Sequence, residues 1–257
     1  TDTDNDTLSF RRLCSKVNSF TTTKQSFNIH IPSGIYLVGM QEDISNSTVV
    51  QTARSIFDLH GRDLHTILIK NDNAIIKLRD GMYYGTFDKA TKKAYPVNMP
   101  FMPSSSQYKD NLGKFTVVSL PTIFNIYSTR NLIMYGGIEI DMNASNMIIG
   151  GGYGDTGHQL PSLGIRLANN LNFNVSDMYI HDSCLDGVYI DGYFPIRASD
   201  ELDYESTGVM TNVRSFKNGR QGMSIVAGQN LTFNNCAFDK NGISSLPVYS
   251  APKSGVD

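Results

Sequence analysis

One repeated pattern constrains the fold of this chain more than any other feature. Four segments begin with a glycine that is followed by alternating apolar and other residues, and a fifth copy starts near the end: 137–141, 164–168, 187–191, 222–226 and 255–257. Alternation with a period of two is typical of a β-strand with one buried face. The glycines lie 27, 23, 35 and 33 residues apart, so similar strands return at a nearly regular interval.

The two longest intervals contain recognisable insertions. Residues 195–207 are polar and rich in acidic side chains, and residues 244–252 include Pro247 and Pro252. Treating both as loops leaves a repeat of about 23 residues. The segments 213–219 and 236–242, which both end in Lys-Asn-Gly, also lie 23 residues apart.

These spacings predict a stack of coils. An asparagine precedes a further set of alternating segments, at Asn131, Asn146, Asn170 and Asn230. Three short strands per coil, with Asn and Gly at the corners, describe a parallel β-solenoid whose coils bury their apolar faces against one another. A β-sandwich gives no reason for a glycine column at this spacing. A doubly wound α/β fold needs long helical patterns, which are missing after about residue 25. We expect one buried ladder in the stack, formed by Ile138, Ile165, Val188 and Met223.

The first residues follow a helical pattern. Apolar side chains share one helical face, and Asp6 or Thr7 is available as the N-cap: Leu8, Phe10, Leu13, Cys14 and Val17. Such a helix would cover the open end of the solenoid, which otherwise exposes unpaired strand groups. We therefore expect residues 1–24 to form an N-terminal cap and residues 25–257 to form the solenoid. Because Gly255 begins a coil with no cap after it, we expect the natural protein to continue, or another chain to cover this edge.

Composition excludes several classes of protein. Hydrophobic residues make up 40% of the chain, charged residues 18%, and the formal net charge is −2. This balance is unlike that of an acidic disordered protein or a dedicated nucleic-acid binder. No apolar stretch is long enough for a transmembrane helix, so we expect neither nucleic acid nor a membrane as partner. The three cysteines show no paired spacing, which argues against a disulfide framework or a zinc site.

The chain resembles right-handed parallel β-helix proteins of the pectin-lyase-like superfamily. The resemblance rests on the N-terminal helix, the turn at 31–36 (Ile-Pro-Ser-Gly-Ile-Tyr) and the coils with Asn and Gly at their corners. That group contains polysaccharide lyases, polygalacturonase-like hydrolases, epimerases and phage tailspikes. The resemblance implies an all-β fold, a right-handed parallel β-helix with an N-terminal capping α-helix. It also implies a glycan bound in a groove along one sheet, above acidic and basic residues from neighbouring coils. Residues 182–188 are loosely similar to a strand of the hydrolases, although Gln221 stands where those enzymes carry paired aspartates.

Strand register places a candidate site on the outward face of the glycine-led strands. The second and fourth residues after each glycine point outward, because strand side chains alternate. These positions, with Asp186 just before its glycine, bring carboxylates, one guanidinium and one aromatic ring together within about three coils. We expect Asp141, Arg166, Asp186 and Asp191 to be catalytic, and Glu139, Tyr189 and His181 to bind substrate. Asp141 and Asp191 would lie roughly 10 Å apart, slightly beyond the separation used in inverting glycoside hydrolysis.

Each of these residues also has a structural interpretation. Glu139 and Arg166 could form a salt bridge between coils, and Asp191 could be a solvated surface residue. Asp186 could bind backbone amides at a corner, and His181 could be a turn residue. No cofactor or metal site is predicted. The acidic run 200–205 could bind Ca²⁺ through oxygen ligands, but a solvated loop is the preferred interpretation.

Together these features favour a carbohydrate-active protein that cleaves an acidic polysaccharide, by hydrolysis or β-elimination. We expect it to be extracellular, as a secreted or cell-surface protein, or exposed on a virion, where a tailspike would imply a homotrimer. The alternative is a non-catalytic adhesin, glycan-binding module or structural spike. A tight acid–base cluster would favour the enzyme, whereas scattered solvated charges would favour the alternative. The long segment between Gly85 and Gly113 is a second place for a functional loop.

Overall fold

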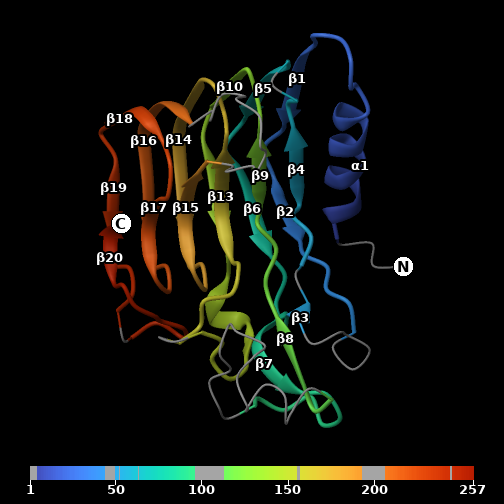
Figure 1. The fold of residues 1–257 in the computed structure, drawn as a ribbon, viewed down its shortest axis with the longest axis vertical. Helices are drawn as coiled ribbons and strands as arrows, with labels where there is room; N and C mark the ends of the chain where they lie inside the picture. The colour runs from blue at the N-terminus through green and yellow to red at the C-terminus, as the bar shows by residue number, and fades with distance from the viewer. Residues whose placement is uncertain are drawn as a thin grey trace, which may run out of the picture.

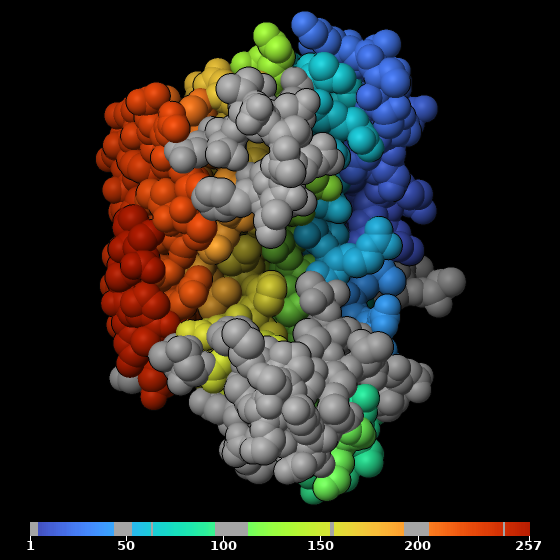
Figure 2. All heavy atoms as spheres, viewed as in Figure 1, coloured from blue at the N-terminus to red at the C-terminus, as the bar shows by residue number. Residues whose placement is uncertain are grey.

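The architecture is a stack of parallel coils with one helix at its first coil (Figure 1). The computed structural model describes residues 5–43, 50–51, 53–62, 64–95, 113–154, 157–192, 206–243 and 245–257. Strands of consecutive coils lie side by side, and the space-filling view shows the same order from the helix to the last strand (Figure 2). The predicted all-β solenoid with an N-terminal helix is therefore confirmed. The expected domain boundary between residues 24 and 25 stays a prediction.

Two parallel sheets form the walls of the stack. The broad sheet contains β1 (Ser26–Ile31), β2 (Ile35–Val38), β5 (Thr66–Asn71), β6 (Ala74–Leu78), β10 (Asn131–Tyr135), β11 (Ile138–Asp141), β14 (Phe173–His181), β16 (Thr207–Phe216), β18 (Gln229–Asn234) and β19 (Ala237–Asp239). The narrow sheet contains β4 (Phe57–His60), β9 (Phe124–Tyr127), β13 (Leu163–Ala168), β15 (Asp186–Asp191), β17 (Gln221–Ile225) and β20 (Ser254–Val256). Each coil crosses the broad sheet and then returns along the narrow sheet, and apolar side chains fill the space between them.

The helix α1 (Thr7–Asn18) packs against the first coil. Its residues Cys14 and Val17 are buried, and the ring of Phe10 lies 4.3 Å from that of Phe57 in β4. Asp6 takes the N-cap position, but its side chain does not cap the helix. Instead Asp6 Oδ2 accepts a hydrogen bond from the Leu37 N–H at 3.1 Å, which ties the start of the helix to β2.

A smaller sheet is built from the segments that lead into the narrow sheet. It contains β3 (Val50–Gln51), β7 (Tyr83–Asp88), β8 (Phe115–Val118) and β12 (Ile148–Ile149). Figure 1 shows β7 and β8 projecting beyond the coils at one end of the strands. Part of the segment after Gly85 is therefore strand rather than loop, and residues 96–112 lie outside the described residues. One short 3-10 turn, η1 (Ala144–Asn146), precedes β12.

The broad sheet bends across its middle at residues with left-handed backbone. Asp177, Asn212 and Asn235 occupy this bend in successive coils, with φ angles of 61°, 54° and 51°. Asparagine and aspartate adopt this conformation more readily than other non-glycine residues. Asn212 Nδ2 donates to Asp177 Oδ1 at 3.0 Å, and Asn235 Nδ2 donates to Asn212 Oδ1 at 2.7 Å. The bend is thus a ladder of hydrogen-bonded side chains along the stack.

The glycine column of the sequence is confirmed in the narrow sheet, with one exception. Ile165, Val188, Met223 and Val256 are direct strand partners in successive coils. The copy at Gly137 belongs to the broad sheet, where Ile138 pairs with Ala74 and Met178. The prediction that Ile138 shares the narrow-sheet ladder is therefore wrong. Apolar and other residues also alternate after a glycine in broad-sheet strands, so this pattern alone does not tell which sheet a strand joins.

The asparagine column is also less regular than predicted. Leu132 in β10 pairs with Phe173, so Asn131 aligns with Asn172 rather than with Asn170. Asn170 instead occupies a corner, where its Oδ1 accepts hydrogen bonds from the Thr129 N–H at 3.1 Å and the Thr129 hydroxyl at 2.6 Å. Buried polar corners of this kind need such partners.

Close packing explains why glycine begins the narrow-sheet strands. A Cβ at Gly187 would overlap Ser215 Oγ and lie 2.8 Å from Asn218 Nδ2. A Cβ at Gly164 would overlap Ile180 and lie 2.7 Å from the Gly187 carbonyl oxygen. These positions face the broad-sheet residues across the core, where no room for a side chain remains.

We expect Gly187→Ala to lower the free energy of unfolding by about 1–3 kcal/mol, as overpacking of a filled core does. Ser215 Oγ cannot move away without losing its 2.7 Å hydrogen bond to the Gly222 carbonyl. Urea unfolding followed by far-UV circular dichroism measures the loss. Gly113→Ala is the matched control, because a Cβ there meets nothing within 4 Å. Equal stability of the two variants would contradict this explanation of the glycine column.

Candidate functional site

The predicted site residues fall into two clusters on different sheets. Arg166, Asp186, Tyr189 and Asp191 lie on β13 and β15 of the narrow sheet. Glu139, Asp141 and His181 lie on β11 and β14 of the broad sheet. The single patch predicted from the sequence is therefore wrong, because β11 joins the broad sheet. The expected pair of Glu139 with Arg166 does not form, and Arg166 pairs with Asp191 instead.

In the narrow sheet, polar side chains form a continuous row across four coils, and we call it the polar row: Asp58, Asn125, Arg166 and Asp191. Arg166 Nη2 donates to Asp191 Oδ2 at 2.6 Å, and Nη1 donates to Asn125 Oδ1 at 3.1 Å. Asn125 Nδ2 donates in turn to Asp58 Oδ1 at 2.7 Å. Asp58, Asn125 and Arg166 are direct strand partners, so the row runs along the stack rather than along a strand.

Asp186 begins the strand that ends at Asp191, and it is completely buried. Its Oδ1 accepts hydrogen bonds from Arg220 Nε at 2.8 Å and from the Gln221 N–H at 3.2 Å. Its Oδ2 accepts one from Ser224 Oγ at 3.0 Å and another from Arg220 Nη2. These partners occupy both carboxylate oxygens, so Asp186 serves as an anchor for Arg220. Arg220 is absent from the predicted set because it stands at a corner, before the alternating pattern of β17 begins.

Tyr189 lies near two ion pairs, Arg166 with Asp191 and Arg220 with Asp186. The ring is half-buried, and this burial is the main reason why the pKa of Tyr189 is raised, with Asp191 contributing and Arg220 opposing. The phenol therefore stays protonated at neutral pH, and it can donate a proton there. Tyr189 and Asp191 are two residues apart on β15, so both point to the outer face of the sheet.

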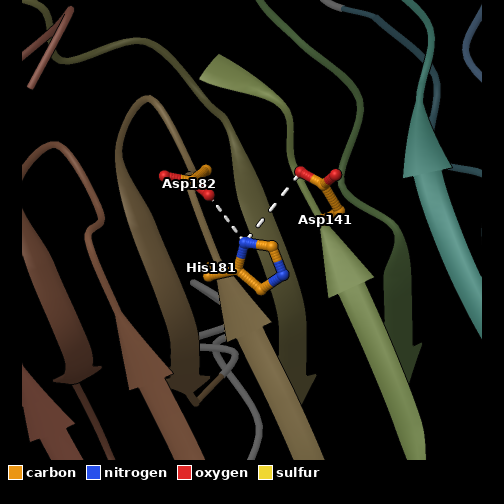
Figure 3. Close-up of side chains that lie close together, drawn as sticks. All are labelled: Asp141, His181 and Asp182. Carbon is orange, nitrogen blue, oxygen red and sulfur yellow. Dashed lines mark hydrogen bonds and ion pairs between the residues drawn. The ribbon is translucent and has the colours of Figure 1, made fainter. Parts of the chain in front are cut away.

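The broad-sheet cluster surrounds one imidazole (Figure 3). His181 Nδ1 lies 2.7 Å from Asp182 Oδ2 and 4.0 Å from Asp141 Oδ1, and Nε2 lies 3.3 Å from Glu139 Oε1. Lys77 Nζ on β6 lies 3.0 Å from Asp141 Oδ2. Burial lowers the pKa of His181, but the hydrogen bonds to Asp182 and Glu139 and the charges of Asp141 and Asp182 outweigh it, so the pKa is raised overall.

This raised pKa makes stability depend on pH. The unfolded histidine has an ordinary pKa of about 6.5, and the folded value is higher, so the folded state binds the proton more tightly. The stabilisation is therefore complete below about pH 6.5 and is lost as the pH rises through the folded pKa. We expect the free energy of unfolding of the wild type to exceed that of His181→Asn more at about pH 5.5 than at about pH 8.5.

Urea unfolding of both proteins across this pH range measures the difference. His30→Asn is the control, because His30 on β1 is an exposed histidine, and its partner Asp72 follows β5. A gap between wild type and His181→Asn that stays constant, or widens with rising pH, would contradict the assignment.

Three side chains of the cluster around His181 resemble a metal-ligand set. One donor atom from each of Asp141, His181 and Asp182 lies within 4.8 Å of the others. The Lys77 ammonium group, 3.0 Å from Asp141, already supplies positive charge to this cluster. We therefore interpret it as an ion-pair network. The acidic run 200–205, considered for Ca²⁺, lies outside the described residues.

The fold and its coils define a class of protein, the parallel β-helix proteins. Residues 121–255 match the family model described as right handed beta helix region. The match covers more than half of the chain, so the protein belongs to this family, and the predicted right-handed β-helix is confirmed.

The A-module of a mannuronan C-5 epimerase from Azotobacter vinelandii is a similar solved structure, with 15% sequence identity and a TM-score of 0.42. The alignment covers 92% of this chain and 53% of that chain, so the chain spans about half of its length. No curated protein matches the sequence. Among the described residues, none of the helices has the length and apolar character needed to cross a bilayer.

Proposed function

We propose that this protein cleaves a polysaccharide on the outer face of the narrow sheet, outside the cell or on a virion. The observation that carries the proposal is the Arg166–Asp191 pair beside Tyr189, at the end of the polar row. A carboxylate, a guanidinium group and a protonated phenol come together there on neighbouring strands. Acid–base cleavage of a glycosidic bond needs a proton acceptor and a proton donor in such proximity.

The polar row supports binding of an extended sugar chain. Its carboxylate, amide and guanidinium groups repeat at the coil spacing of about 4.8 Å, over roughly 14 Å in all. Planar polar groups of this kind hydrogen-bond the hydroxyl groups of a sugar. The longest chain insertions lead into or out of the narrow sheet: residues 39–56, 79–123, 142–162 and 240–253 precede its strands, and 192–206 follow β15. Insertions next to a sheet are a common source of ligand contacts, because binding residues are often carried on loops.

Two guanidinium groups favour an acidic sugar. Arg166 and Arg220 lie on the coils before and after the strand that carries Tyr189, and both affect its pKa. Arginine binds carboxylates through paired hydrogen bonds, so the carboxylate of a uronate could be held between them. Asp186 would hold Arg220 in place for this contact.

The chemistry follows from the positions of Asp191 and Tyr189. In hydrolysis, Asp191 takes a proton from a water molecule while the oxygen of that water attacks the anomeric carbon. The glycosidic bond breaks, and the leaving oxygen takes the proton of Tyr189. In β-elimination, Asp191 takes the proton next to the uronate carboxylate. The electron pair then forms a C=C bond, the bond from the neighbouring carbon to the glycosidic oxygen breaks, and that oxygen takes the proton of Tyr189. Arg166 keeps a positive charge beside Asp191 in both routes.

A panel of acidic and neutral polysaccharides tests the proposal. Release of reducing ends without absorbance of unsaturated uronides indicates hydrolysis, and both signals together indicate β-elimination. Neither signal across the panel would overturn the proposal of cleavage.

A non-catalytic glycan-binding module is the second candidate. It is favoured by the fact that each charged side chain of the polar row already has a hydrogen-bond partner in the row. Retention of the protein on one of the polysaccharides, without cleavage of any, would support this alternative.

A further inference from the structure

We propose that the broad sheet carries a second carbohydrate-binding surface, centred on Tyr179 and selective for an uncharged glycan. The proposal rests on the proposed function only for the class of ligand, a carbohydrate. The surface lies on the broad sheet, whereas the polar row lies on the narrow sheet.

Tyr179 is an exposed aromatic residue on a rigid strand. It lies within the nine-residue strand β14, and 53% of its surface is exposed. The strand pairs with β11 on one side and β16 on the other, so its backbone is fixed. An exposed tyrosine presents an apolar ring with a polar tip, which suits a ligand that has both apolar and hydroxyl-bearing faces.

Planar polar side chains flank the ring on both neighbouring coils. Glu139 and Arg214 are the direct strand partners of Tyr179. Glu139 contacts His181 Nε2 at 3.3 Å, and Arg214 lies over the ring of Phe216, 4.8 Å from its centroid. The His181 and Phe216 rings stack with centroids 5.1 Å apart. These contacts hold the surface in one arrangement before a ligand arrives, which lowers the entropic cost of binding.

A stacking ring between a carboxylate and a guanidinium group fits a sugar ring. The C–H face of a sugar packs on an aromatic ring, and its hydroxyl groups pair with planar donors and acceptors. The charges select among sugars, because the cations Lys77 and Arg214 are already paired with the carboxylates of Asp141 and Asp239. His181 is likewise flanked by Glu139 and Asp182, so none of these three cations is left over for a polyanionic ligand. The surface therefore disfavours a polyanion, and an uncharged glycan is the ligand that fits.

Affinity electrophoresis tests the inference without requiring turnover. Gels containing xylan, galactomannan or mixed-linkage β-glucan should retard the wild-type protein in at least one case. Tyr179→Ala should weaken that binding by at least about tenfold, as loss of an aromatic anchor does. Tyr179→Phe keeps the ring and should retain most of the affinity. Tyr249→Ala is the matched control, since Tyr249 is similarly exposed, at 45%, but lies in another part of the chain.

Three results would overturn the inference. The first is that none of the three neutral polymers retards the protein, and the second is that wild type and Tyr179→Ala bind equally. The third is a change of oligomeric state in Tyr179→Ala, measured by size-exclusion chromatography. The last would identify the face as a contact between copies of the chain. Loss of cleavage in the polysaccharide panel would leave these binding results unchanged, so the two proposals fail separately.

Discussion

Asp191→Asn is expected to lower kcat on the cleaved polysaccharide by at least about a hundredfold, as loss of an acid–base group does. The amide keeps the size of the side chain and can still contact Arg166 Nη2, which now lies 2.6 Å from Asp191 Oδ2. It cannot take a proton from water or from a sugar carbon. The effect should therefore appear in kcat, while KM changes little.

Arg166→Ala should lower turnover as well, and it should also raise KM, because the polar row loses its contact to Asn125. Far-UV circular dichroism checks that both variants fold. Asp72→Asn is the control, since Asp72 forms an ion pair with Lys70 on the broad sheet. Full activity in both Asp191→Asn and Arg166→Ala would place the site elsewhere, on the cluster around His181 or in the segment between Gly85 and Gly113.

Asp186→Ala is expected to lower the free energy of unfolding by about 3–5 kcal/mol, the usual cost of removing one partner from a buried ion pair. Asp186 is completely buried, and the Arg220 side chain is 19% exposed. The substitution leaves the guanidinium group and the Gln221 N–H without their acceptor. The largely buried charge then has no carboxylate to compensate it and only limited contact with water.

Urea unfolding measures this loss as well. The double variant Asp186→Ala/Arg220→Met should regain much of it, because it no longer leaves an unpaired buried charge. Asp72→Ala, which breaks an exposed pair, should change stability far less. If Asp186→Ala costs no more than Asp72→Ala, the interpretation of Asp186 as an anchor is wrong.

The sequence predicts the coils well because their strands carry two independent signals. Ile165, Val188 and Met223 alternate with outward residues and follow glycines at a regular spacing, and they pair as predicted. Ile138 has the same local pattern but a different sheet, since the pattern records only that one face is buried. A local signal therefore identifies a strand and its inward side, and the position of the strand in the coil needs the structure.

The candidate site is harder to predict because its contacts join different coils. Lys77 reaches Asp141 across a strand pair whose members are separated by a long insertion, so no constant spacing links them. Arg220 lies at a corner, where alternation has ended. Arg166, Tyr189 and Asp191 are brought together as predicted, because they lie on adjacent strands of the regular part of the stack.

The hydrogen-bonded ladder at the bend of the broad sheet has a consequence for how such a protein can evolve. Asp177, Asn212 and Asn235 each need the same left-handed backbone and a neighbour in the next coil. An inserted residue there would break two contacts at once and shift every following pair by one. The long insertions occur instead at the corners on either side of the narrow sheet, where other contacts, such as that of Asn218 Nδ2 with Asn241 Oδ1 at 3.0 Å, join the coils. New loops can thus be gained, lost or exchanged next to the polar row while the stack stays intact, so ligand preference and fold can change independently.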